Sequence, residues 1–510
     1  MEKKTAAVKM RNITKRFGSI VANDKCWLDI YRGEILALLG ENGSGKTTLM
    51  NMLSGIYFPD EGQITIDDRE VVIRSPKDAF DLGIGMIHQH FKLVDVLTAA
   101  ENIVLGLEGK LDLKAASERI REICDLYGFE VDPNQKIYDM SVSQKQTVEI
   151  VKVLFRGADI LILDEPTAVL TPQETDKLFA VLRNMRDDNK AVVIITHKMH
   201  EVEALSDRVA VLRHGQFIGD MLTKDTDAQE MTNMMVGRPV TLNIDRPEPK
   251  DPKPRIVVEG LTVRSVDGIL KLDDVSFTAN SGEILGIAGI SGCGQKELLE
   301  SIAGLQPTEG GSIRYVQDDG TEEELLGKDP LAIAELGVTL SFVPEDRLGM
   351  GLVGNMDLSD NMMLRSFRRG RSVFTDRRTP KKLAETVVQE LEVNTPGVTT
   401  PVRRLSGGNV QKVLVGREIA AAPTVLLTAY AVRGLDINSS YTIYDLINRQ
   451  KAAGVAVIYV GEDLDVLLEL ADRILVLCGG KVSGIVPGRG ATKRKVGLMM
   501  TKLGGDTQDA

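Results

Sequence analysis

Residues 40–47 read Gly-Glu-Asn-Gly-Ser-Gly-Lys-Thr and fit the pattern G-x-x-x-x-G-K-[ST] of a phosphate-binding loop. The loop follows an apolar, strand-like run and opens a helical pattern near Lys46. In this arrangement the glycines let backbone N–H groups turn toward phosphate oxygens, and the helix directs its positive end at the same anion. Lys46 is suited to neutralise the β- and γ-phosphates, and Thr47 to ligate Mg²⁺. The stretch therefore predicts a nucleotide site between a strand and a helix.

The same plan occurs a second time further along the chain. Residues 32–40, RGEILALLG, recur as residues 281–289, SGEILGIAG. The phosphate loops are 249 positions apart (289 minus 40), and later counterparts are 265 apart. These later pairs are Ser141 and Ser406, Asp164 and Ala429, and His197 and Glu462. Repetition on this scale predicts two related domains, the second with 16 extra residues (265 minus 249) after its loop.

Length and local composition place the domain boundary. A chain of 510 residues exceeds the usual size of a single hydrophobic core. Residues 246–254 hold four prolines in nine positions, which favours an extended spacer and forbids a helix. Apolar runs at 160–163 and 192–195, separated by helical patterns, predict buried strands of a mainly parallel α/β sheet. We expect a first domain over residues 1–240, a linker over 241–255 and a second domain over 256–505.

Composition narrows the class of protein. The chain is 43% hydrophobic and 26% charged, with no apolar stretch of about 18 residues and no signal-peptide core, so we expect a soluble cytoplasmic protein. The four cysteines are scattered without metal-binding spacing and are expected to be reduced packing residues. A net charge of -11 argues against general nucleic-acid binding. One basic segment, Arg365 to Lys382, is interpreted as a solvated face or loop, with a partner or lipid headgroups as the alternative.

Two carboxylates follow a buried strand in the first copy. Residues 160–167 read ILILDEPT, in which Asp164 is suited to the Mg²⁺ shell and Glu165 to polarising an attacking water. Helix N-capping is the structural alternative for such a pair. His197, directly after the run 192–195, is a candidate γ-phosphate contact, although a lone histidine is often only a satisfied polar residue. Gln89 could complete the environment of the metal and the water.

These residues together resemble those of the ATP-binding-cassette (ABC) ATPases, and residues 405–409, LSGGN, resemble that family's signature sequence. The resemblance covers nearly the whole chain as two tandem cassettes. It implies an α/β protein with two nucleotide-binding domains of the P-loop NTPase fold. Each domain would have a mainly parallel sheet, an antiparallel β subdomain and a helical subdomain. In the family, two cassettes close head to tail, and each ATP lies between the phosphate loop of one and the signature of the other.

The resemblance implies one complete composite ATP site, called site one, built from both copies. Its catalytic residues would be Glu165, His197 and Gln89. Its Mg²⁺ ligands would be Thr47, Gln89 and Asp164. The residues that would contact ATP are Phe17, Gly40, Asn42, Gly43, Gly45, Lys46, Thr47, Thr48, Ser406, Gly407, Gly408 and Asp436. Phe17 fits the aromatic position that stacks on adenine, and an ordinary core phenylalanine fits it equally.

The second composite site, site two, departs from the family pattern at nearly every point. Gln295 stands for the lysine and Lys296 for the hydroxyl ligand of Mg²⁺. The facing signature, residues 140–144, has become MSVSQ, in which Val142 and Ser143 replace glycines that let the backbone approach phosphate. Further replacements are Ala429 for Asp164, Tyr430 for Glu165, Glu462 for His197 and Glu345 near the counterpart of Gln89. We expect no hydrolysis at site two, and nucleotide binding there is left open.

The tandem arrangement is similar to the fused ATPase subunit of bacterial importers for simple sugars and nucleosides. Residues 85–94 and 164–174 are most similar to the nucleoside branch, with sugars as the alternative cargo. The implied partners are two integral-membrane permease subunits and an extracytoplasmic solute-binding (lipo)protein, without nucleic acid. The chain is then expected at the cytoplasmic face of the cell membrane, with residues 91–105 meeting the permease. Ribosome-associated tandem cassettes are a more distant alternative, but they have two competent sites and a long charged linker.

Overall fold

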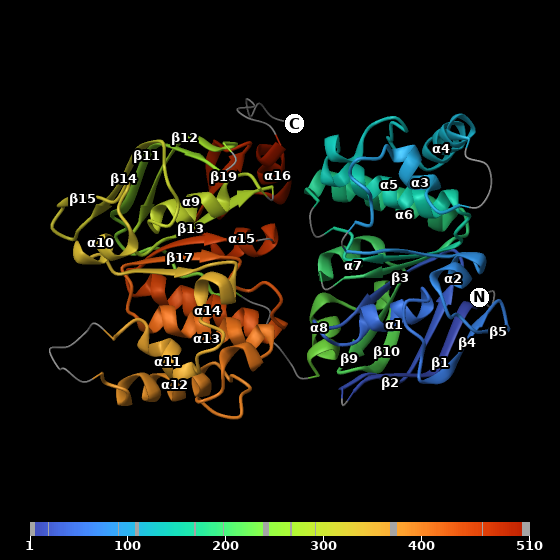
Figure 1. Cartoon of the computed structure of the whole chain (residues 1–510), viewed down its shortest axis with the longest axis horizontal. Helices are drawn as coiled ribbons and strands as arrows, with labels where there is room; N and C mark the ends of the chain where they lie inside the picture. Colours follow the sequence, from blue (N-terminus) through green and yellow to red (C-terminus); the bar gives the residue numbers. More distant parts are fainter. Residues whose placement is uncertain are drawn as a thin grey trace. The chain divides into compact units, whose positions relative to one another are not determined.

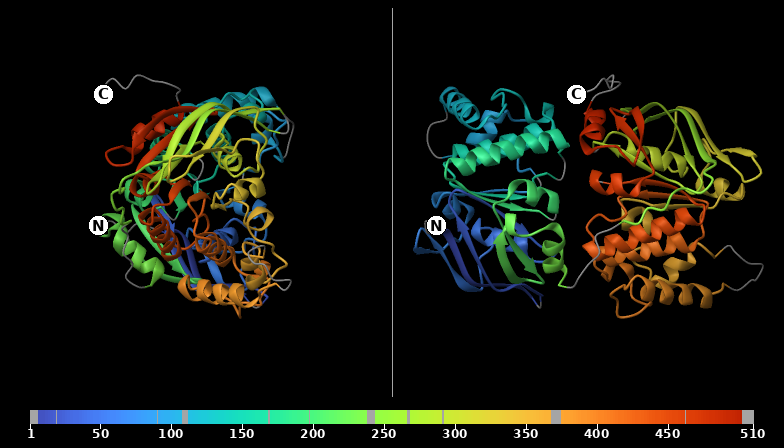
Figure 2. Two further views of the ribbon diagram at one scale, coloured as in Figure 1. Left: turned by 90° about the vertical axis from the view of Figure 1, so that its left-hand side faces the viewer. Right: turned by 180° about the vertical axis from the view of Figure 1, so that it is seen from behind.

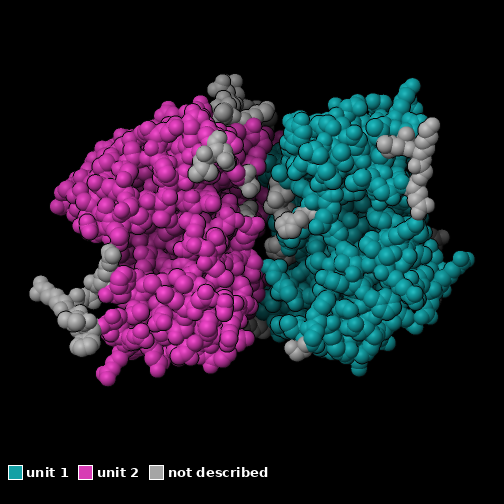
Figure 3. All heavy atoms as spheres, in the orientation of Figure 1, with its two compact units in different colours: residues 1–241 teal, residues 242–510 magenta. Residues whose placement is uncertain are grey.

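The computed structural model describes residues 6–18, 20–89, 91–107, 112–167, 170–196, 198–237, 244–265, 268–290, 292–367, 375–461 and 463–501. The chain divides into two compact units, residues 1–241 and residues 242–510, coloured separately in Figure 3. Each unit contains one four-stranded and one six-stranded sheet. Among the described residues, no helix is both long and apolar enough to cross a bilayer.

The first unit combines an antiparallel sheet with a mainly parallel one. The antiparallel sheet has the order β2-β1-β4-β5, with β1 (Ala6–Phe17), β2 (Ile20–Tyr31), β4 (Glu61–Ile66) and β5 (Arg69–Val71). The larger sheet has the order β10-β9-β3-β8-β7-β6, with β3 (Glu34–Leu39), β6 (Ile84–Ile87), β7 (Ile160–Asp164), β8 (Ala191–Ile195), β9 (Arg208–Arg213) and β10 (Gln216–Leu222). Only β10 runs antiparallel to its neighbour in the larger sheet.

Helices of the first unit lie on both sides of the larger sheet. They are α1 (Lys46–Leu53), α2 (Pro76–Asp81), α3 (Ala99–Val104), α4 (Leu113–Tyr127), α5 (Val142–Phe155), α6 (Pro172–Asp187), α7 (Met199–Leu205) and α8 (Ala228–Val236). Helices α3 to α6 cover one face, whereas α1 and the antiparallel sheet cover the other (Figures 1 and 2). This three-layer arrangement is the expected α/β fold with a helical part and an antiparallel part.

The second unit repeats this topology strand for strand. Its antiparallel sheet, β12-β11-β14-β15, contains β11 (Pro254–Arg264), β12 (Leu270–Asn280), β14 (Gly310–Val316) and β15 (Glu322–Glu324). Its larger sheet, β16-β17-β18-β13-β19-β20, contains β13 (Ile284–Gly289), β16 (Leu340–Val343), β17 (Val425–Ala429), β18 (Ala456–Val460), β19 (Arg473–Cys478) and β20 (Lys481–Pro487). Its helices are α9 (Gln295–Ile302), α10 (Pro330–Glu335), α11 (Leu358–Met363), α12 (Arg378–Glu390), α13 (Gly407–Ala420), α14 (Ile437–Ala452), α15 (Leu464–Leu470) and α16 (Lys493–Thr501).

Burial on both faces explains the unbroken apolar runs. In β7, Leu161 and Leu163 pack into the core under the helices, while Ile160 and Ile162 pack into the core toward the antiparallel sheet. Side chains alternate between the faces of a strand, so a strand covered on both sides needs apolar residues at every position. The expectation of buried parallel strands is therefore confirmed.

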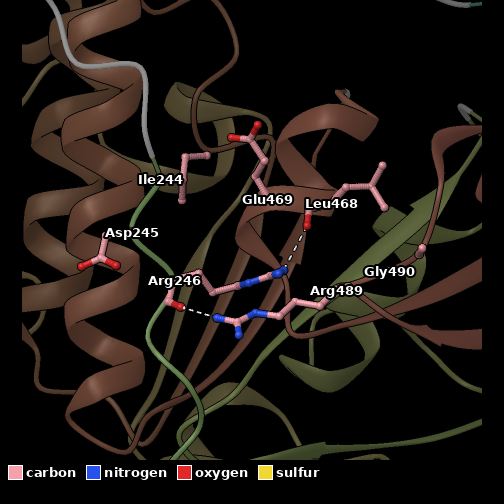
Figure 4. Close-up of a pocket in the computed structure, with 9 residues that line it drawn as sticks. Ile244, Asp245, Arg246, Leu468, Glu469, Arg489 and Gly490 are labelled. Carbon is pink, nitrogen blue, oxygen red and sulfur yellow. Dashed lines mark hydrogen bonds between the residues drawn. The ribbon is translucent and has the colours of Figure 1, made fainter.

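The proline-rich segment packs against the second unit. Residues 244–253 form neither helix nor strand, and β11 begins at Pro254, inside the range expected for the linker. Arg246 donates to the carbonyl of Leu468 at 3.0 Å, and Arg489 donates to the carbonyl of Arg246 at 3.1 Å (Figure 4). Lys451 donates to the carbonyl of Pro247. A cavity of about 620 Å³ lies beside this contact, and no predicted site residue lines it.

The basic segment is mixed in character. Arg365 pairs with Glu418, which is 1% exposed and also pairs with Arg417, so this arginine belongs to the fold. Arg377, Arg378, Lys381 and Lys382 are exposed at the start of α12, as a solvated face requires. The remaining arginines of the segment lie outside the described residues. All four cysteines are free, and two of them, Cys26 and Cys124, are buried in the core.

Candidate active site

The first phosphate loop connects β3 to α1 in the first unit (Figure 1). Gly43 and Gly45 have φ angles of 82° and 95°, in the left-handed region that favours glycine. A Cβ atom on Gly45 would lie 2.4 Å from the carbonyl oxygen of Ala22, and one on Gly40 would lie 2.3 Å from that of Leu212. The loop therefore accepts no side chain at Gly40 or Gly45, whereas Asn42 and Gly43 are exposed at its crest.

Lys46 lies beneath the loop with its ammonium group buried. Its Nζ donates to the carbonyls of Gly40 at 2.7 Å and Glu41 at 3.0 Å, and the residue is 6% exposed. Burial lowers the pKa of Lys46, while the charges of Glu165, Asp164 and Glu41 act in the opposite direction. A desolvated cation whose hydrogen bonds, among the described residues, go to carbonyl oxygens is well placed to gain from an arriving phosphate.

The two residues expected to hold Mg²⁺ lie together. The hydroxyl of Thr47 donates to Oδ2 of Asp164 at 3.1 Å, and Asp164 ends β7 with 8% exposure. Burial raises the pKa of Asp164 and Glu165 adds to that effect, while Thr47 and Lys46 oppose it. One hydroxyl and one carboxylate fit Mg²⁺, which proteins bind through few side chains together with phosphate oxygens and water. Thr48 follows in the first turn of α1.

Glu165 and Gln89 also meet. Nε2 of Gln89 donates to Oε2 of Glu165 at 3.1 Å. Glu165 has a φ angle of 47°, and its N–H donates to the carbonyl of Ile195 at 2.9 Å. Left-handed backbone at a non-glycine residue is costly and is concentrated at functional sites. Neither Asp164 nor Glu165 caps a helix, so the capping alternative is wrong. The third predicted catalytic residue, His197, lies outside the described residues.

Phe17 ends β1 at the surface of the first unit. The residue is 42% exposed, so the alternative of a core phenylalanine is wrong. The ring of Tyr57 packs edge-to-face against it, with centroids 5.2 Å apart. Sequence reasoning missed Tyr57, because nothing in its neighbourhood carries a phosphate or metal motif. An exposed, buttressed ring can stack on a planar base.

The second unit presents the intact signature at a helix start. Ser406 caps α13, and its Oγ accepts from Nδ2 of Asn409 at 2.8 Å. Ser406 and Gly407 are exposed, and Gly408 is partly buried. Asp436 caps α14, with Oδ1 accepting from the N–H of Ser439 at 2.8 Å. The approach of these residues to the phosphate loop of the first unit stays a prediction.

The second phosphate loop resembles the first in its backbone but lacks the lysine and the hydroxyl ligand of the first. Gln295 is 4% exposed and donates to the carbonyl of Ile290 at 3.2 Å, as Lys46 does to that of Glu41. The side chain of Lys296 is 58% exposed and lies 3.8 Å from Glu300. Glutamine thus fills the space of the lysine without supplying a charge.

The turn after β17 also has the same backbone shape as the turn after β7. Tyr430 has a φ angle of 54°, and its N–H donates to the carbonyl of Val460 at 2.9 Å, which repeats the turn at Glu165. Ala429 and Tyr430 offer neither a metal ligand nor a carboxylate for water. Glu462, the counterpart of His197, lies outside the described residues.

The altered signature of the first unit forms the same cap with different residues behind it. Ser141 caps α5 and exchanges hydrogen bonds with Gln144, as a capping box. Val142 is 41% exposed at the position where the intact signature has Gly407. Thr171 caps α6 where Asp436 caps α14, so a hydroxyl replaces a carboxylate at that position.

Comparison with known proteins gives the family. The family model described as ABC transporter matches residues 24–168 and 272–428, which together exceed half of the chain. The chain belongs to the ABC transporter family. Its two units are the two cassettes, and the chain is an ABC-type ATPase that binds ATP.

Several known proteins are similar to this chain over nearly the whole length of both chains. The nucleoside import ATP-binding protein NupA of Lactococcus lactis is 40% identical, covering 98% of this chain and 99% of the relative. The guanosine import ATP-binding protein NupO of Bacillus subtilis is also 40% identical, with 98% of each chain covered. The glucose import ATP-binding protein TsgD13 of Haloferax volcanii is 39% identical, covering 99% of this chain and 97% of the relative.

Proposed function

We propose that this chain energises a bacterial importer for nucleosides and hydrolyses ATP at site one only. The observation that carries the one-site proposal is the contrast between two similar turns. In the first cassette, Thr47 contacts Asp164 and Gln89 contacts Glu165. In the second, the same backbone carries Ala429 and Tyr430.

Separate residues of site one bind the phosphates, hold the metal ion and orient the attacking water during phosphoryl transfer. Lys46 exchanges its carbonyl partners for β- and γ-phosphate oxygens, and the N–H groups of the loop bind the same oxygens. Thr47, Asp164 and Gln89 would hold Mg²⁺, which would neutralise charge on these phosphates. Glu165 accepts a hydrogen bond from the attacking water and orients it in line with the leaving group.

The second cassette completes the site, and His197 of the first contacts the γ-phosphate. Ser406 and the N–H groups of Gly407 and Gly408 bind the γ-phosphate from the opposite side, and Asp436 approaches the same site. Phe17 stacks on adenine. ATP therefore joins the cassettes, and loss of the γ-phosphate after hydrolysis releases them.

The motion passes to membrane partners. Two integral-membrane permease subunits bind the cassettes, and an extracytoplasmic solute-binding protein delivers the cargo. The chain is then peripheral to the cytoplasmic face of the membrane. Residues 91–105, which follow Gln89 and include α3, are the expected contact with the permease.

Names of relatives support nucleosides over sugars, because NupA and NupO are nucleoside and guanosine import proteins. TsgD13 is a glucose import protein of similar identity, and sugars are therefore the alternative. We expect the chain, purified from membranes with its permease and solute-binding protein, to drive ATP-dependent uptake of labelled guanosine into vesicles. Uptake of ribose or glucose without any nucleoside would contradict the nucleoside proposal and leave the ATPase chemistry untouched.

A further inference from the structure

The second cassette contains a short insertion beside its intact signature. From the end of β6 to the start of α3 there are 12 positions in the first cassette (99 minus 87). From the end of β16 to the start of α11 there are 15 positions in the second cassette (358 minus 343). The longer segment of the second cassette contains a π turn of five residues, Arg347–Gly351. Asp346 caps the turn by accepting from the N–H of Gly349 at 2.8 Å.

Arg347 joins two loops that the proposed function assigns to site one. Its Nη1 donates to the carbonyl of Gly407, in the intact signature, at 3.0 Å. Its Nη2 donates to the carbonyl of Arg433, three residues before Asp436. The side chain is half-buried between them. A guanidinium group presents its donors in a rigid plane, so both loops are fixed relative to one another.

Two residues at altered positions of site two also contact the segment that Arg347 binds. Glu345 stands near the counterpart of Gln89 and pairs with the side chain of Arg433 at 2.5 Å. The guanidinium of Arg433 also lies 5.9 Å from the ring centroid of Tyr430, which stands where Glu165 stands in the first cassette. The residues at the positions of Gln89 and Glu165 thus both contact the segment whose carbonyl Arg347 binds.

The two matching positions of the first cassette carry other residue types. Counted from the end of the preceding strand, the position of Arg347 corresponds to Phe91, since each lies four residues beyond that end. The position of Arg433 corresponds to Ala168 (433 minus 265). Neither side chain can donate a hydrogen bond, so these two positions do not supply the contacts that Arg347 and Arg433 make in the second cassette.

We propose that Arg347 is a positioning residue for ATP hydrolysis, which holds the intact signature and the Asp436 loop in the geometry that site one requires. The inference rests on the proposed composite site. Because Ser406 and Gly407 are exposed, Arg347 supplies a restraint that core packing does not. Displacing a group that binds the transition state by about 1 Å can lower a rate by about 100-fold.

The test compares the full-length chain with the variants Arg347→Ala and Arg347→Lys. Arg449→Ala is the matched control, because Arg449 pairs with Asp445 on the exposed face of α14. Steady-state phosphate release gives kcat and KM, a fluorescent ATP analogue gives nucleotide affinity, and thermal unfolding gives Tm. We expect Arg347→Ala to lower kcat about tenfold or more, with affinity and Tm close to those of the control. Arg347→Lys should recover part of the loss.

Three outcomes would overturn the role of Arg347. A further variant, Ser406→Arg, tests the composite site itself. The first outcome is an unchanged kcat in Arg347→Ala together with loss of turnover in Ser406→Arg, which would support the composite site but not a role for Arg347. The second is equal loss of kcat, affinity and Tm in both Arg347 variants, which marks a role in folding alone. The third is full turnover in Ser406→Arg, which removes the composite site itself and with it any role for Arg347.

Discussion

Replacing Glu165 by Gln is expected to abolish ATP turnover while leaving ATP binding intact. Glutamine has the same shape and can still contact Gln89, whose Nε2 lies 3.1 Å from Oε2 in the native side chain. It cannot attract a proton from the attacking water, and general-base catalysis typically contributes about 100-fold or more. Phosphate release measures turnover, and titration with a fluorescent ATP analogue measures binding.

The matched control for this change is Glu462→Ala in the second cassette. Glu462 is the counterpart of His197, at a site that lacks the lysine, the aspartate and the glutamate. We expect its turnover to stay within about twofold of the native chain. Equal losses in both variants would mean that both sites hydrolyse ATP, which the one-site account does not allow.

The second large effect is expected from Lys46→Gln, which gives the first loop the residue found at position 295. Lys46 is buried with its pKa lowered by burial, and its ammonium group is positioned to receive phosphate. Glutamine can keep one bond to a loop carbonyl, as Gln295 does to that of Ile290, without the charge. Hydrogen bonds to charged groups contribute about 1.5–3 kcal/mol, so ATP affinity should fall about 10- to 100-fold.

The reverse change, Gln295→Lys, serves as the control. It restores the cation to the second loop, but Lys296, Ala429 and Tyr430 still lack the metal ligands and the carboxylate. Turnover should therefore remain that of the native chain. A doubling of turnover would identify site two as a latent catalytic site and would contradict the account.

Much of the candidate site follows from sequence because each motif ends a buried strand. Parallel strands bring their carboxyl ends to one edge of a sheet, so Thr47, Gln89 and Asp164 converge once the strands are assigned. The contacts of Thr47 with Asp164 and of Gln89 with Glu165 agree with that reasoning. The left-handed turn at Glu165 does not follow from sequence, because it depends on a hydrogen bond to the neighbouring strand.

Other features depend on contacts between distant residues. Arg347 lies 60 positions from Gly407, and the three-residue insertion that presents it carries no motif. The proline-rich segment reads as a spacer, yet Arg246 binds a carbonyl 222 positions away and ties it to the second unit. Exposure of Phe17 was also undecided, since an aromatic residue at a strand end suits either a core or a stacking surface.

One measurement tests the single composite site most directly: steady-state ATP turnover of Ser406→Arg compared with Ser141→Arg. Both serines cap a helix of 14 residues, so each substitution removes an equivalent cap and adds the same bulk. Only Ser406 belongs to the signature that faces the complete phosphate loop in the proposed arrangement. We predict that Ser406→Arg abolishes turnover and that Ser141→Arg retains it. Equal loss in the two variants, or loss in Ser141→Arg alone, would contradict the account.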